Sequence, residues 1–203
     1  MSVASKDFYL TITQPSVAEY KDRGSKFIAY AYPIKLVDEF KVALKQVKEL
    51  HPKASHHCFA YKIGLDNNTF RVSDDGEPSS SAGRPILNAI ESKEITDVLI
   101  VVVRYFGGTL LGVPGLINAY KHTALLALQV TPIVQKPILN IYELQFDYTL
   151  KNNVMSIVKQ LSCEVLENEN QLFCIMKVGV QTSKEADFVH RLKDYHTISF
   201  KKI

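Results

Sequence analysis

The segment DVLIVVVRYF, residues 97–106, constrains the fold more than any other part of the chain. Its apolar run from Val98 to Val103 has the length of a strand and no polar face. Strands of this kind lie at the centre of sheets that helices cover on both sides. The residues that follow, GGTLLGVPGLINAY, predict a glycine turn and then a helix from Gly115 to about Gln129. We therefore expect an α/β unit with this strand at its centre.

The remaining N-terminal residues predict the elements around this strand. Short extended pieces occur at residues 9–12 and 17–20, and a turn at 22–25 leads into a strand over 26–32, which indicates a hairpin. A helix follows, with Asp38 as its cap and apolar residues at helical spacing up to Leu50. Strands over 55–63 and 70–74 precede the polar loop DGEPSSSAG, and Arg84-Pro85 begins a short helix.

The segment TPIVQKP, residues 131–137, breaks the helical pattern and predicts a boundary between two domains, residues 1–136 and 137–203. The second part has the order strand, helix, strand, strand, helix, strand, which is typical of a ferredoxin-like βαββαβ domain. A hairpin turning at Asn168-Glu169 would place Cys163 opposite Cys174. We interpret both as buried thiols, with a disulfide as the alternative.

Composition indicates a soluble globular protein, with 46% hydrophobic and 22% charged residues. No apolar run reaches the roughly 20 residues that a membrane span needs. The N-terminal residues lack the apolar stretch of a secretion signal, so we expect a cytoplasmic protein. The net charge is +3; residues 1–137 hold 16 Lys and Arg against 13 Asp and Glu, and residues 138–203 hold 8 of each. The excess positive charge therefore weakly favours an anion site in the first part.

The glycine turn allows three interpretations. Gly107, Gly108, Gly112 and Gly115 lie between a strand and a helix, where backbone N–H groups can hold a phosphate. Their spacing matches neither the dinucleotide-binding GxGxxG pattern nor the phosphate-binding GxxxxGK[ST] pattern, which argues against a nucleotide site. A general anion contact and a structural corner are the other two interpretations.

Arg104 lies near the end of the apolar strand, where a guanidinium either reaches the surface or pairs with a carboxylate. Its candidate partners are Asp74, Asp75 and Glu77 in the polar loop. A pair would join the loop and the glycine turn into one site, whereas a surface salt bridge would contribute little. The three carboxylates could also bind a hard cation, although they lack the calcium-loop spacing. Hydrogen bonding to nearby backbone N–H groups is the commoner use of such residues.

Two further groups of polar residues are candidates for a site. His56 and His57 are adjacent on a strand, so their side chains point to opposite faces and do not easily serve one metal ion or substrate. Asn118, Lys121 and His122 share one face of the helix after the glycine turn. That face either extends an anion-binding surface or is the solvated side of an amphipathic helix.

Several segments resemble those of a known family. HHCFAY, SDDGEPSSSAGRPIL and VVVRYFGGTLLGVPGLINAY are similar, in order and spacing, to signature segments of the IMPACT/YigZ family, and KDRGSKFIAYAYPI resembles its N-terminal segment. The resemblance covers essentially the whole chain. It implies an N-terminal α/β domain of the ribosomal-protein type, similar to the fourth domain of elongation factor G, and a C-terminal domain similar to the fifth. It also implies a link to translation, because eukaryotic relatives bind a translation-associated activator protein and so restrain a starvation-responsive kinase.

These features predict a translation-associated regulatory protein that binds RNA or a ribosome-associated surface. We favour a binding protein over an enzyme and expect no cofactor, metal or membrane. The expected contacts are five side chains and the backbone of two glycines: Lys26, His57, Arg84, Arg104, Lys121, Gly107 and Gly108. The alternative is a hydrolase or small-molecule-binding protein that uses Asp74, Asp75, Glu77 and His57 around Arg104. A protein-interaction module is a third possibility, and it would present an exposed apolar patch.

Overall fold

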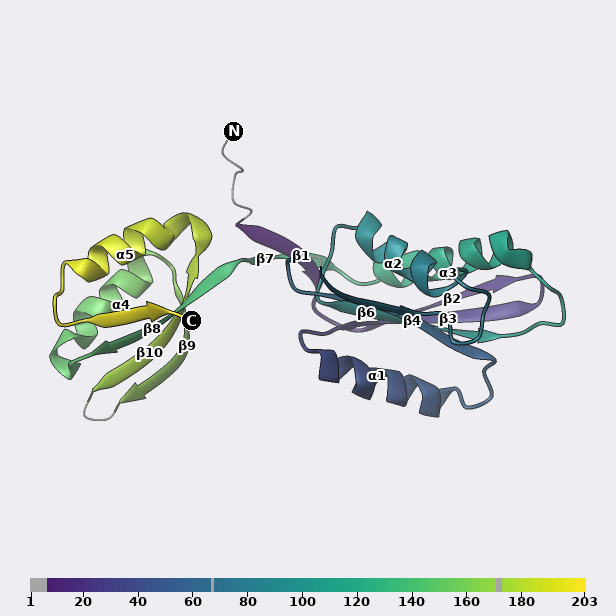
Figure 1. Ribbon diagram of the computed structural model, residues 1–203, viewed down its shortest axis with the longest axis horizontal. Coiled ribbons are helices and arrows are strands. Elements are labelled where there is room, and N and C mark those ends of the chain that lie inside the picture. The colour runs from purple at the N-terminus through teal and green to yellow at the C-terminus, as the bar shows by residue number, and fades with distance from the viewer. Residues whose placement is uncertain (1–6, 67, 171–172) are drawn as a thin grey trace, which may run out of the picture. The chain divides into compact units, whose positions relative to one another are not determined.

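The computed structural model describes residues 7–66, 68–170 and 173–203. The chain divides into two compact units, which we call the N-terminal unit, Tyr9–Lys136, and the C-terminal unit, Pro137–Ile203 with the described residues Asp7 and Phe8. Each unit contains both strands and helices, so the protein is of the mixed α/β class (Figure 1). Within the described ranges, no helix is both long and apolar enough to span a membrane.

The N-terminal unit is built on a five-stranded sheet. Its elements are β1 (Phe8–Ile12), β2 (Ser16–Asp22), β3 (Ser25–Pro33), α1 (Val37–Leu50), β4 (His56–Ile63), β5 (Thr69–Ser73), α2 (Gly83–Ser92), β6 (Val98–Tyr105), α3 (Gly112–Gln129) and β7 (Ile133–Pro137). The sheet order is β2-β3-β6-β4-β5, with each neighbouring pair antiparallel. β1 and β7 form a separate two-stranded sheet. The apolar strand is therefore central, as its sequence predicts.

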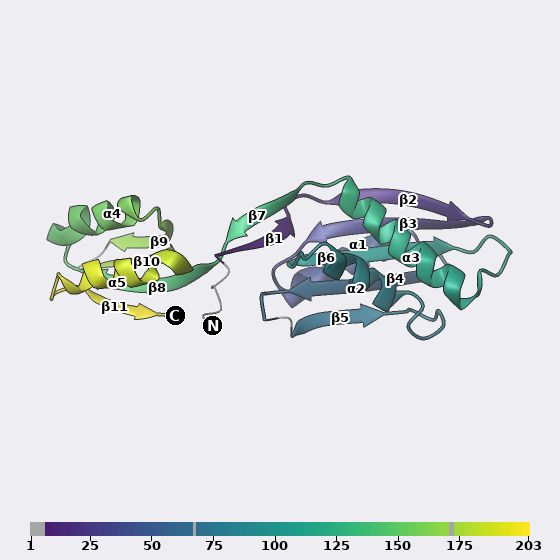
Figure 2. The same cartoon turned by 90° about the horizontal axis from the view of Figure 1, so that it is seen from above.

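Helices cover both faces of the five-stranded sheet. α1 lies on one face, and α2 and α3 lie on the other (Figures 1 and 2). Because side chains alternate along a strand, β6 contributes Ile100 and Val102 to the core under α2 and α3, and Val101 and Val103 to the core under α1. This two-sided burial explains why the strand is apolar at every position from Val98 to Val103.

Two local predictions for this unit are wrong. α1 begins at Val37, so Asp38 lies within its first turn, and Glu39 instead accepts hydrogen bonds from the backbone N–H groups that precede the helix. α3 begins at Gly112, which places Pro114 inside its first turn, where a missing N–H costs little. The segment 131–137 includes the strand β7, which pairs with β1.

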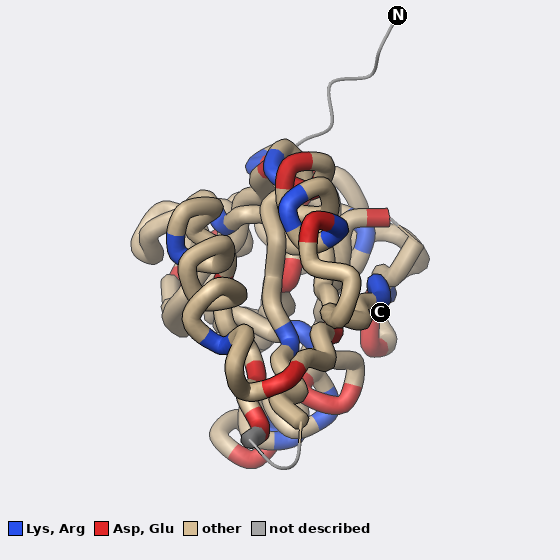
Figure 3. The backbone as a smooth tube through the Cα atoms, turned by 90° about the vertical axis from the view of Figure 1, so that its left-hand side faces the viewer, with Lys and Arg blue, Asp and Glu red and all other residues tan. Residues whose placement is uncertain are grey.

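The C-terminal unit has one sheet and two helices. Its elements are β8 (Leu139–Phe146), α4 (Lys151–Gln160), β9 (Glu164–Asn170), β10 (Cys174–Gln181), α5 (Glu185–Lys193) and β11 (Ser199–Lys202), with short 3-10 turns before both helices. The sheet order is β11-β8-β10-β9, and all of its pairs are antiparallel. Acidic and basic positions are interspersed along this unit (Figure 3).

The hairpin between β9 and β10 corrects the predicted cysteine pairing. Cys174 lies opposite Asn170, and Glu169 lies opposite Ile175, so the chain turns later than Asn168-Glu169. Cys163 precedes β9 and is not the cross-strand partner of Cys174. The predicted equal spacing of the two thiols around the turn, and the disulfide alternative that depended on it, are wrong.

Candidate functional site

A buried ion pair joins the acidic loop to the central strand. Arg104, at the end of β6, donates a hydrogen bond from Nη1 to Glu77 Oε1 over 2.7 Å. The two side chains are 6% and 4% exposed. Of the three carboxylates predicted as partners, Glu77 is therefore the one that Arg104 holds. The alternative of a surface salt bridge is wrong, since a charged pair at this depth persists only when both members are paired.

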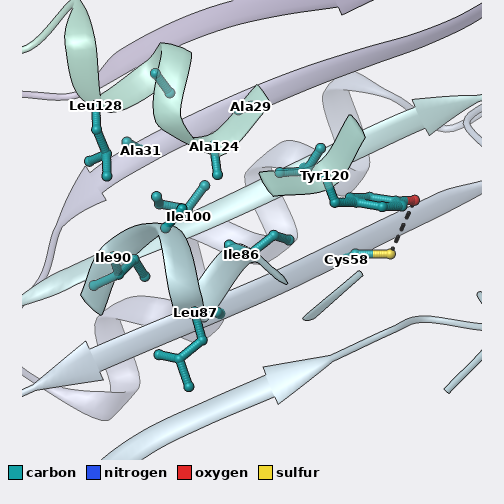
Figure 4. Packing of buried hydrophobic residues seen from close by; sticks show 14 of the residues in the cluster. Ala29, Ala31, Cys58, Ile86, Leu87, Ile90, Ile100, Tyr120, Ala124 and Leu128 are labelled. Atoms are coloured by element: carbon teal, nitrogen blue, oxygen red, sulfur yellow. Dashed lines mark hydrogen bonds between the residues drawn. The ribbon is translucent and has the colours of Figure 1, made fainter. Parts of the chain in front are cut away.

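Glu77 also connects the loop to α3. The Tyr120 hydroxyl donates to Glu77 Oε1 over 2.7 Å, and the Cys58 thiol on β4 donates to Tyr120 Oη over 3.4 Å. Figure 4 shows this last bond at the edge of the aliphatic core that α2 and α3 form with the sheet. Burial raises the pKa of the Cys58 thiol and of the Tyr120 hydroxyl well above their ordinary values. Both groups therefore stay protonated at neutral pH and act as hydrogen-bond donors rather than nucleophiles.

The carboxylate of Asp74 shapes the loop and the start of α2. Its Oδ1 accepts hydrogen bonds from the N–H groups of Ala82 and Gly83, and its Oδ2 accepts one from Ser80. Backbone N–H groups at the start of a helix have no partner within that helix. Asp74, which lies outside the helix, supplies that partner. Both of its carboxylate oxygens are therefore hydrogen-bonded to backbone N–H groups.

Asp75 and the adjacent histidines lie around the first residues of β4. Asp75 Oδ2 accepts from the backbone N–H of His57, and its carbonyl oxygen lies 2.8 Å from Nδ1 of His56. The two imidazoles point to opposite faces of the sheet, as predicted. His56 Nε2 lies 3.8 Å from Glu77 Oε1, whereas His57 Nε2 lies 3.1 Å from the carbonyl oxygen of His51. His56, rather than His57, is thus the histidine next to the buried pair.

The face of the sheet under α1 carries a tyrosine–histidine chain that the sequence did not reveal. His51 Nε2 lies 2.6 Å from the Tyr30 hydroxyl, and its Nδ1 lies 2.8 Å from the Tyr105 hydroxyl. Burial lowers the pKa of both His51 and His57, so both imidazoles are neutral at physiological pH. The alternation of side chains along a strand could have placed Tyr30 and Tyr105 on the same face of the sheet. Nothing in the sequence placed His51, which lies beyond the end of α1, between them.

The glycine turn is held by close backbone contact. A Cβ on Gly107 would lie 1.9 Å from the carbonyl carbon of Gly24, so only glycine fits where the turn meets the β2–β3 hairpin. The N–H of Gly107 donates to Ser25 Oγ over 3.2 Å. Gly108 has a φ of +84° and open space around its Cα. At Gly107 this geometry supports the structural-corner interpretation, since the N–H that a phosphate would need is already bonded.

The predicted cationic contacts lie in different places. Lys26 on β3 is half-exposed and pairs with Glu19 over 2.6 Å. Arg84 is exposed on α2, 3.9 Å from Glu91 of the same helix. Lys121 is exposed on α3 and lines a hollow of about 380 Å³ with Tyr20, Asn118, His122 and Leu125. Arg104, in contrast, is buried and cannot touch a ligand at the surface.

The carboxylates and histidines do not converge on one empty cavity. Asp74 binds backbone N–H groups, Glu77 binds Arg104 and Tyr120, and His57 lies on the other face of the sheet. Among the described residues, no group of three or more His, Cys, Asp or Glu side chains is arranged to hold a metal ion. The arrangement fixes the loop, β6 and α3 relative to one another.

Known proteins are similar to this chain in sequence and in fold. Residues 23–128 match the family model of the Impact N-terminal domain. The chain is 32% identical over 175 residues to the IMPACT family member YigZ of Escherichia coli (strain K12), covering 85% of this chain and 86% of that protein. It is 34% identical over 98 residues to Protein IMPACT of Rattus norvegicus, or 47% of this chain and 31% of that one. A crystal structure described as that of a hypothetical protein superposes with a TM-score of 0.75 at 29% identity, over 97% of this chain and 98% of the other.

Proposed function

Because the chain belongs to the IMPACT family, we propose that it is a translation-associated regulatory protein whose N-terminal unit binds RNA or a ribosome-associated surface. We also propose that the N-terminal unit resembles the fourth domain of elongation factor G and that the C-terminal unit is ferredoxin-like. The βαββαβ order and the sheet order β11-β8-β10-β9 support the second of these fold assignments.

A basic edge on the N-terminal unit carries the proposal. Its cations are Lys21, Arg23 and Lys26 on the β2–β3 hairpin and Lys121 on α3, and Glu19 and Asp22 are the acidic residues of the same hairpin. The hairpin and α3 meet where the Tyr20 and His122 rings lie 4.8 Å apart. Because side chains alternate along a strand, Lys21 and Lys26 point to the face opposite Tyr20, so these cations and Lys121 flank the edge strand β2 from its two sides. Phosphate groups are bound chiefly by such exposed lysines and arginines, with little dependence on base sequence.

The buried network favours binding over catalysis. Asp74 and Asp75 accept hydrogen bonds from backbone N–H groups, and Glu77 is enclosed by Arg104 and Tyr120. A general acid or base must reach its substrate within hydrogen-bond distance, and these carboxylates are occupied in holding the fold. The enzyme alternative predicts turnover that Asp75→Asn abolishes without unfolding the protein. Loss of the fold together with any turnover would instead assign Asp75 a structural role.

The test is co-sedimentation with ribosomes in lysate, with and without nuclease, across a series of salt concentrations. We expect binding to fall steeply with salt and to be lost after nuclease treatment. The double variant Lys26→Ala/Lys121→Ala should reduce the slope of log affinity against log salt by about two, because each phosphate contact contributes about one. Lys41→Ala/Lys45→Ala on α1 removes the same charge from elsewhere and is the matched control.

Two outcomes would overturn the proposal. Affinity that does not change between low and physiological salt would exclude phosphate contacts. Equal losses in the two double variants would show a response to net charge rather than to the basic edge. Arg104→Ala is unsuitable for this test because its side chain is buried, and any loss of binding would report a disturbed fold.

A further inference from the structure

Four large apolar side chains are exposed in the twelve-residue segment that contains the glycine turn and the start of α3. They are Phe106, Leu110, Val113 and Ile117, and we call them the turn surface. Leu110 is 81% exposed and Phe106 49%. Val113 and Ile117 are four residues apart on α3 and share one face, and Leu110 lies just before that face begins. Clustered exposed apolar side chains of this size mark interaction sites more often than isolated ones do.

The turn surface is held in place from beneath. The Arg104 guanidinium lies 5.5 Å from the centres of both the Phe106 and the Phe27 rings, and it is hydrogen-bonded to the buried Glu77 and Ser25. The backbone of Gly107 packs against Gly24 so closely that no side chain fits between them. The exposed residues therefore project from a fixed corner. A surface that is already ordered loses little conformational entropy on binding.

The segment that carries the turn surface has no acidic residue. From Phe106 to Tyr142 the sequence contains no Asp or Glu. The first turn of α3 has no acidic residue to offset the positive end of its helix dipole. Lys121, one turn beyond Ile117, is exposed beside the hollow that it lines with His122. An apolar surface is thus followed along α3 by a cationic one.

We propose that the turn surface docks an amphipathic helical segment of a protein partner. The apolar face of that segment packs on Phe106, Leu110 and Val113, and its acidic side chains point towards Lys121. A second copy of this chain fits less well, because a two-fold interface would bring two acid-free surfaces together. Single-stranded RNA also fits less well, since bases stack on aromatic rings and three of the four side chains are aliphatic. The inference goes beyond the proposed function and holds whether or not the basic edge binds RNA.

The experiment uses the full-length protein and three fluorescein-labelled helical peptides. The first has a leucine face flanked by glutamates, the second has lysines in place of the glutamates, and the third has the composition of the first in scrambled order. Fluorescence anisotropy measures each affinity at low and physiological salt. We expect the acidic amphipathic peptide to bind at least tenfold more tightly than the other two. Its advantage over the lysine peptide should shrink as salt rises.

Three variants locate the binding. Leu110→Ser should lower the affinity for the acidic peptide about tenfold. Because this side chain is largely exposed, the midpoint of thermal unfolding should not change. Leu50→Ser at the end of α1 removes a leucine that is 64% exposed and is the matched control. Lys121→Glu should lower the affinity for the acidic peptide and raise the affinity for the lysine peptide. A purely hydrophobic contact would give neither change.

Four outcomes would overturn the proposal. The first two are equal binding of the three peptides and equal losses in the Leu110 and Leu50 variants. The third is a dimer, detected by sedimentation equilibrium, that Leu110→Ser dissociates, and the fourth is binding of an RNA oligonucleotide that Leu110→Ser abolishes. Leu110→Ser separates this proposal from RNA binding, because it should weaken binding of the acidic peptide and leave ribosome co-sedimentation through the basic edge unchanged. Lys121 belongs to both surfaces, so its variants do not separate the two proposals.

Discussion

The two units offer a buried ion pair and an exposed one for comparison. In the N-terminal unit, the side chains of Arg104 and Glu77 are 6% and 4% exposed and their bond fixes a loop to the central strand. In the C-terminal unit, Glu143 pairs with Lys201 over 2.9 Å at the surface of the sheet, where Lys201 is 67% exposed. The difference follows from the layers. A sheet covered on both faces must pair its charges internally, whereas a face without helices leaves them to water.

Breaking the buried pair should have the largest effect. Arg104→Ala leaves Glu77 buried without its cation, which we expect to lower the free energy of unfolding by about 3–5 kcal/mol. Urea denaturation measures the change. In a double-mutant cycle with Glu77→Gln, the two losses should be far from additive. Additive, small losses would mean that the pair is as solvated as those of the C-terminal unit.

The glycine corner should give the second largest effect. Gly107→Ala places a methyl group against the backbone of Gly24, and we expect a loss of about 3 kcal/mol from this overpacking. Gly108→Ala is the control, since its surroundings are open and only its positive φ is strained, at a cost of about 1 kcal/mol. Thermal unfolding measures both losses. A larger loss for Gly108→Ala than for Gly107→Ala would show that the hairpin moves to accommodate the methyl group and that the contact between Gly107 and Gly24 is not rigid.

Acidification should weaken the N-terminal unit through its histidines. Burial lowers the pKa of His51 and His57 in the folded state, so the unfolded chain binds protons more readily. Their contribution to stability is therefore complete above the unfolded pKa of about 6.5 and declines as the pH falls below it. Hydrogen exchange at pH 7.5 and 5.5 should show earlier opening of β3 and β4 at the lower pH. The variant His51→Gln should respond less, and an equal response would assign the effect to other groups.

The exposed pair should give the smallest effect. Lys201→Ala removes the partner of Glu143 from a solvated position, and the urea midpoint should stay within experimental error. Raising the salt concentration should leave the wild type and this variant equally stable. A loss comparable to that of Arg104→Ala would refute the contrast between the two units.

Sequence reasoning recovered the parts of the fold that depend on local pattern. The run from Val98 to Val103 located the central strand, and the order of strands and helices in the C-terminal unit followed from periodicity. Element ends were less predictable, because the start of α3 and the pairing of β7 depend on contacts distant in sequence. The cysteine pairing failed for a similar reason. Register is set by the burial of a whole strand face rather than by symmetry about a turn.

The candidate site was only partly predictable. A guanidinium on an apolar strand needs a carboxylate partner, and this requirement placed Glu77 among the predicted partners of Arg104. The burial of Glu77 and its bond to Tyr120 depend on tertiary packing and were not predicted. Exposed charges such as Lys26 and Lys121 were recognised by residue type, although their arrangement was not. The turn surface escaped notice, since an exposed leucine and a buried one look the same in a sequence.

The pairing of β1 with β7 bears on how the N-terminal unit is made. These strands lie near the two ends of the unit, so the chain must close a loop of more than a hundred residues to join them. Loop closure over such a distance contributes nothing until both strands have been synthesised. At a typical pace of about 5–20 residues per second, β1 emerges several seconds before its partner exists. During that interval β1 lacks its partner strand, although Leu10 can bridge to Ile95 once that residue has emerged, and the last few residues of the unit complete its assembly.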